Sequence, residues 1–107
     1  MPDKRVQIIV VAGMVQVNPP GPVGVSFSRA ESVVWYCNDG EAEIDFAKGP
    51  RGSPFMSDKF TIPSGGFVGT GGPFRGKVSQ RYKYIVTVTP PGGPALPPLD
   101  PEVEVEN

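Results

Sequence analysis

Four carboxylate side chains alternate along one short segment and form the row best placed for chemistry: Asp39, Glu41, Glu43 and Asp45. In a β-strand every second side chain points to the same face, so neighbouring carboxylates would lie about 7 Å apart. Several oxygen ligands suit a hard cation such as calcium. A flat strand does not curl around an ion, and the plainer prediction is a solvent-exposed face balanced by Arg81 and Lys83 across the sheet. Calcium binding by the Asp39–Asp45 strand stays as the alternative.

The chain has one cysteine, Cys37, and no histidine. The absence of histidine excludes a Ser-His-Asp triad, a Cys-His pair and a histidine-based zinc site. Cys37 follows Trp35 on an apolar segment, which predicts a buried, inert thiol, because a reactive thiol needs exposure and a cationic neighbour. The glycine pairs at 65–66 and 71–72 precede no helix-forming segment, so they do not predict a phosphate-binding loop. We therefore predict no enzymatic activity and no cofactor.

Length and composition predict one folded domain over residues 1–107. The 14 glycines and 14 prolines cluster between short apolar runs, as turns do between strands. A net charge of −1 argues against nucleic acid, and no apolar run reaches the ~20 residues of a membrane-spanning helix. The apolar run Val6–Ala12 is too short for a signal peptide, which favours a first strand and a cytoplasmic location.

Alternating apolar residues predict an all-β protein of about seven to eight strands, a Greek-key β-sandwich with little or no helix. Asp39-Gly40 predicts a hairpin turn after the strand 32–37. The 81–89 segment is the clearest strand, with Tyr82, Tyr84, Val86 and Val88 on one face and Arg81, Lys83, Ile85 and Thr87 on the other. Further strands are expected at 6–11, 14–17, 23–27, 41–46, 59–62 and 102–106, with weaker pairing at 67–68 and 74–78.

Several short motifs follow one another along the chain: Val33-Val34-Trp35, Asn38-Asp39-Gly40, Ile44-Asp45-Phe46, Pro54-Phe55, Tyr82-Lys83-Tyr84, the Pro90–Pro98 loop and Val103-Glu104-Val105. The order of these motifs resembles that of the cupredoxin family. The resemblance implies a cupredoxin-like sandwich and, in the family, a copper site of two histidines, a cysteine and usually a methionine.

The copper ligands are missing. Ala42 and Glu43 stand where the resemblance implies the first histidine, and Val86 and Val88 stand where it implies the cysteine. No methionine occurs near Leu96–Leu99. Without the soft thiolate and imidazole ligands that bind copper, a metal-free scaffold is expected.

We therefore expect a binding or protein-interaction module, with a self-associating structural protein as a further alternative. Loops on a rigid sheet commonly carry binding, so we expect the surface at one end, from the loops Lys48–Asp58, Ser64–Pro73 and Pro90–Pro98. The residues predicted for this interaction surface are Phe55, Phe67, Arg81, Lys83, Glu41, Glu43 and Asp45. A basic group and a second acidic row would make the surface dipolar: Arg75, Lys77, Arg81 and Lys83 against Glu102, Glu104 and Glu106.

Overall fold

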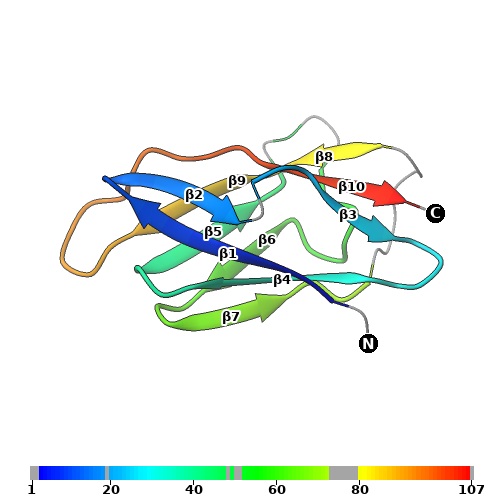
Figure 1. Ribbon diagram of the computed structural model, residues 1–107, viewed down its shortest axis with the longest axis horizontal. Helices are drawn as coiled ribbons and strands as arrows, with labels where there is room; N and C mark the ends of the chain where they lie inside the picture. Colours follow the sequence, from blue (N-terminus) through cyan, green and yellow to red (C-terminus); the bar gives the residue numbers. More distant parts are fainter. Residues whose placement is uncertain (1–2, 19, 48, 50–51, 73–79, 107) are drawn as a thin grey trace.

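The computed structural model describes residues 3–18, 20–47, 49, 52–72 and 80–106, and these contain ten strands and no helix (Figure 1). The all-β prediction is confirmed, with more strands than the seven or eight expected. No helix among the described residues is long and apolar enough to cross a membrane. The strands are β1 (Asp3–Val11), β2 (Met14–Asn18), β3 (Val23–Ser26), β4 (Ser32–Cys37), β5 (Glu41–Asp45), β6 (Lys59–Ile62), β7 (Gly66–Gly69), β8 (Arg81–Lys83), β9 (Ile85–Thr89) and β10 (Glu102–Glu106).

One layer of the sandwich is a four-stranded sheet in the order β2-β1-β4-β7, called here the first sheet. The β1–β2 hairpin turns through Ala12 and Gly13. Strand β4 runs parallel to β1, and β7 runs antiparallel to β4 and lies along the lower side of Figure 1. Because β1 and β4 are parallel and far apart in sequence, local patterns could not predict their pairing.

The other layer contains the sheets β6-β5-β9 and β3-β10-β8. Val86 and Leu99 exchange backbone hydrogen bonds, and this pairing continues the β8–β10 ladder along β9. The predicted 81–89 strand is interrupted only at Tyr84. The reason is its partner Pro101, which accepts a hydrogen bond from the Tyr84 N–H but has no N–H to return.

The core between the layers is built on aromatic rings. Trp35 is fully buried, and its ring centroid lies 5.3 Å from that of Tyr84 and 6.1 Å from that of Phe46. The Trp35 indole N–H donates a hydrogen bond of 3.2 Å to the Tyr84 hydroxyl. The predicted alternation of 81–89 is confirmed, because Tyr82, Tyr84, Val86 and Val88 are all buried. On β4 the alternate residues Val33, Trp35 and Cys37 are buried as well.

Two local predictions are wrong. The Asn38–Gly40 turn is not a hairpin, because it carries the chain from β4 in the first sheet to β5 in the other layer. Gly40 allows this crossing, since a Cβ there would lie 2.5 Å from the Thr89 carbonyl oxygen. The strand predicted at 23–27 ends at Ser26, because the chain turns at Phe27 and leaves its ring 43% exposed.

The three predicted loops do not share one end of the molecule. Since β5 and β9 are antiparallel, the loop that follows Asp45 leaves from the opposite end to the loop that follows Thr89 (Figure 1). The Ser64–Pro73 segment contains β7 and runs along the first sheet. The predicted pairing of 74–78, together with Arg75 and Lys77, lies outside the described residues, as do Lys48 and Pro73.

We expect Ala12→Asn to raise the free energy of unfolding by about 1 kcal/mol. Ala12 has φ 52° and Gly13 φ 76°, and two such residues in a two-residue hairpin mark a turn that prefers Asn-Gly. Urea denaturation measures the change. As a control, Gly13→Ala should lower stability through the backbone alone, because nothing lies within 4 Å of the added Cβ. A loss of stability in Ala12→Asn would contradict this account of the turn.

Alkaline pH should destabilise the fold through Tyr84. Burial raises the pKa of Tyr84 from 10.0 to about 12, and the hydrogen bond from Trp35 opposes only part of this shift. The folded state therefore holds the phenol proton more tightly than the unfolded chain does. Its stabilisation is full below pH 10 and is lost as pH rises towards 12, by about 3 kcal/mol in total.

Denaturant titrations across this pH range test the prediction, with Tyr84→Phe as the control. Tyr84→Phe leaves the buried indole N–H without an acceptor, so we expect a loss of about 1–3 kcal/mol at neutral pH. The variant should also show a smaller loss of stability between pH 10 and 12. An equal alkaline loss in both proteins would show that Tyr84 is not its source.

Candidate functional site

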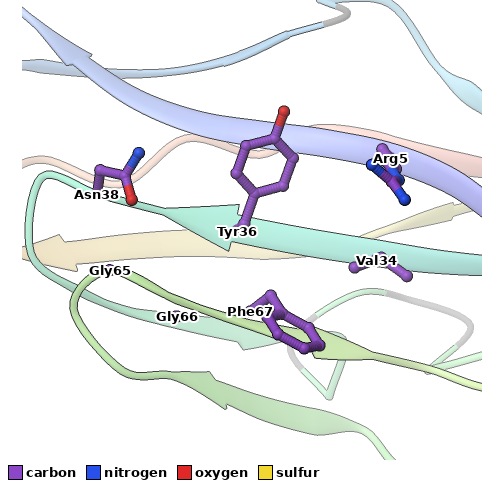
Figure 2. Close-up of a pocket in the computed structure, with 7 residues that line it drawn as sticks. All are labelled: Arg5, Val34, Tyr36, Asn38, Gly65, Gly66 and Phe67. Carbon is purple, nitrogen blue, oxygen red and sulfur yellow. The ribbon is translucent and has the colours of Figure 1, made fainter.

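A groove of about 560 Å³ lies on the outer face of the first sheet (Figure 2). Because Trp35 and its alternate neighbours on β4 point into the core, Val34 and Tyr36 must point outwards. Pairing of β4 with its two neighbours places Arg5 beside Val34 and Phe67 beside Tyr36. The lining residues come from β1, from β4 and the turn after it, and from β7 and the turn before it: Arg5, Val34, Tyr36, Asn38, Gly65, Gly66 and Phe67.

Two aromatic side chains give the groove its apolar character. Phe67 is 72% exposed, and Tyr36 is half-buried. Figure 2 shows the Tyr36 ring leaning over β1 and the Phe67 ring lying along β7, so the rings point apart. The space between them is lined by Val34 and the side-chain-free Gly66.

Arg5 supplies the only charged side chain among the groove-lining residues. No described residue forms an ion pair with it. Asn38 adds an exposed amide at the other end of the groove, and an amide both donates and accepts hydrogen bonds. The lining therefore combines apolar surface, one cation and one amide, a composition suited to binding.

Phe67 is the predicted interaction residue that the structure places in this groove. The prediction for Phe55 is wrong, because its ring is fully buried and lies 5.9 Å from Phe46, measured between ring centroids. The Phe55 N–H donates to the Ser53 hydroxyl, and this local bond turns the loop inwards. A Pro-Phe pair in a loop does not reveal whether its ring faces the core or solvent.

The acidic strand does not gather its carboxylates. Asp39 points back to β1 and accepts a 2.9 Å hydrogen bond from the Val10 N–H. Asp45 was predicted on the exposed row but is buried, because β5 ends there and its carboxylate accepts from the Ala47 N–H at 2.8 Å. Among the described residues no group of three or more His, Cys, Asp or Glu could hold a metal ion.

Glu41 and Glu43 remain exposed, but their cross-strand neighbours are Thr89 and Thr87 rather than basic residues. The predicted pairing of this strand with Arg81 and Lys83 is wrong, since β8 pairs with β10.

Arg81 is exposed, and its guanidinium is shared between two carboxylates. Its Nη1 atom lies 3.6 Å from Oε1 of Glu102, and its Nε atom lies 4.0 Å from Oε2 of Glu104. Lys83 is exposed and is opposite Glu102 in the ladder. These opposite charges alternate within one sheet, so they do not form the separate acidic and basic sides that were expected.

Arg5, Tyr36 and Asn38 were not predicted as site residues. The alternation of residues 32–37 places Tyr36 on the face opposite Trp35, and this is the sequence feature from which Tyr36 could have been predicted as a surface residue. The contribution of Arg5 depends on the parallel β1–β4 pairing, which no local pattern reveals.

Comparison of the chain with family models, with curated proteins and with solved structures gives no match. The resemblance to the cupredoxins therefore stays a prediction from the sequence motifs.

We expect the native protein to resist thiol reagents. Cys37 is fully buried, and burial raises the pKa of its thiol, which lowers the fraction of reactive thiolate. A chromogenic disulfide reagent should react slowly with the folded protein and rapidly in denaturant. The variant Ser64→Cys provides a control, because Ser64 is exposed and its replacement should react at once. Rapid reaction of Cys37 in the folded protein would contradict this prediction.

Proposed function

We propose that this protein is a non-catalytic binding module whose groove on the first sheet holds an acidic segment of a partner protein. The proposal keeps the metal-free cupredoxin-like scaffold, supported by the order of the sequence motifs. It moves the binding surface from the loops to the face of the sheet. The observation that carries it is the exposed Phe67 ring beside Tyr36 and Arg5 in one groove.

The aromatic residues account for the apolar part of recognition. A phenyl ring left in water forgoes the stabilisation of burial, and exposed apolar side chains that gather on one face mark a binding surface. Tyrosine and arginine are also enriched among the residues that contribute most to binding at protein interfaces. A large apolar side chain of the partner would fill the space over Val34 and Gly66, between Tyr36 and Phe67.

Arg5 accounts for the charge of the partner. Its guanidinium is exposed and forms no ion pair with a described residue, so a carboxylate of the partner would complement it. The Asn38 amide would bond to the partner backbone.

The size of the apolar surface supports a protein segment over a small molecule. The same outer face continues along β1 and β2 to Val11, which is 47% exposed, and Met14, which is 63% exposed. Contact along this face would cover more of the sheet than the groove alone.

Panning a displayed library of random short peptides against the protein tests this proposal. We expect enriched peptides to share an acidic residue and a large apolar residue. Calorimetry with one such synthetic peptide should show binding about tenfold weaker, or ~1.4 kcal/mol, for Arg5→Gln and for Phe67→Ala. Glu43→Gln is the matched control, since Glu43 lies on β5 in the other layer, and its affinity should be unchanged.

The outcome that contradicts the proposal is equally specific. Enriched peptides without an acidic residue, peptides that bind Arg5→Gln and Phe67→Ala as tightly as the unmodified protein, or the absence of any enriched peptide would each overturn it. Thermal denaturation of each variant shows that the change in affinity does not come from unfolding.

A further inference from the structure

We propose that two copies of this chain pair through β7, so that their first sheets join into one continuous eight-stranded sheet. This inference concerns the edge of the sheet and is independent of which ligand the groove holds. It rests on the direction of the backbone groups of β7, on the composition of that strand and on the spacing of Phe67 and Gly69.

Strand β7 presents free backbone groups at the edge of the first sheet. Within the part of the chain that the structure describes, its hydrogen-bonded neighbour is β4 alone. In an antiparallel ladder, successive residues direct their N–H and C=O groups alternately towards the neighbour and away from it. The Thr70 N–H donates to the Val33 carbonyl at 2.9 Å, so Thr70 and Val68 face β4. Phe67 and Gly69 therefore direct their N–H and C=O groups to the open edge.

The composition of β7 leaves this edge without the usual protection against pairing. Edge strands commonly carry lysine or proline, which block the addition of a further strand. The sequence Gly66-Phe67-Val68-Gly69 contains no charged residue and no proline. The edge strand β6 differs, since it begins with the exposed Lys59 and is followed by Pro63.

The spacing of the two outward-directed residues makes this edge complementary to itself. A second copy related by a two-fold axis midway between the two Val68 residues would place its Gly69 opposite Phe67 and its Phe67 opposite Gly69. Each of these two pairs exchanges two backbone hydrogen bonds. Each Phe67 ring would then cover a glycine, an arrangement that stabilises glycine at a sheet edge.

The surface above Gly69 has room for that ring. A Cβ added to Gly69 would meet only Val34 Cγ2, at 3.7 Å, among the neighbouring atoms. Because the two-fold axis would be perpendicular to the joined sheet, both grooves would lie on the same face. The dimer would therefore present two binding grooves to one partner surface, which strengthens binding through a higher effective concentration.

The pairing should be weak and dependent on concentration. Stable interfaces bury well over a thousand Å² in total, more than a pair of four-residue strands provides, so we expect a dissociation constant on the order of 1 mM. Sedimentation equilibrium over concentrations around this value should show the mass rising from 11.4 kDa towards twice that value.

Two variants locate the interface. Gly69→Lys adds a charge where the second copy must approach, and its Cβ fits the monomer, so the protein should fold and remain monomeric. Gln16→Lys is the matched control, because it adds the same charge to exposed β2 at the opposite edge of the sheet and should leave dimerisation intact.

Amide hydrogen exchange of the unmodified protein reports the register without any substitution. The N–H groups of Phe67 and Gly69 should gain protection as concentration rises, whereas that of Gln16 should not. A constant mass of 11.4 kDa at all concentrations, or dimerisation that Gln16→Lys abolishes and Gly69→Lys does not, would overturn the proposal. Gly69 does not line the groove, but a Cβ there would lie 3.7 Å from Val34 Cγ2, so the peptide-binding test keeps Gly69 unchanged and its result is separate from this one.

Discussion

The contact between Trp35 and Tyr84 is the interaction on which the rest of the structure depends. It joins β4 of the first sheet to the junction of β8 and β9 in the other layer, through ring packing at 5.3 Å and a buried hydrogen bond. Both polar groups are removed from water, so each needs the other as its partner. The pair therefore fixes which layer faces which and how far apart the layers lie.

This constraint also determines what the outer face of the first sheet presents. With Trp35 fixed inwards, the two-residue period of β4 places Tyr36 outwards, and the neighbouring strands bring Arg5 and Phe67 beside that position. The position of the groove on the outer face therefore follows from the packing of the core. The same sheet carries the proposed groove ligand on its face and the proposed second copy along its β7 edge, and the Phe67 ring takes part in both proposals.

The charged residues have mainly structural roles. Asp39 satisfies a backbone N–H of β1 beyond the end of β4, and Asp45 stabilises the turn after β5. Arg81 is balanced by Glu102 and Glu104 on the adjacent strand. Exposed pairs of this kind contribute little to stability. Arg5, by contrast, is the charged residue among those that line the groove.

The sequence alone determined the all-β class, most strand positions and the inner faces of β4, β8 and β9, because the alternation of side chains along a strand is a local property. It also excluded histidine-based chemistry, since that needs only the composition. Tertiary structure alone decided that β1 runs beside β4, that Phe55 turns inwards and that the acidic carboxylates separate. It also decided that the predicted loops lie apart and that the groove lies on the face of a sheet. These features depend on which distant segments pack together. The free energy of that packing comes from the burial of whole strand and sheet faces, which a short stretch of sequence does not reveal.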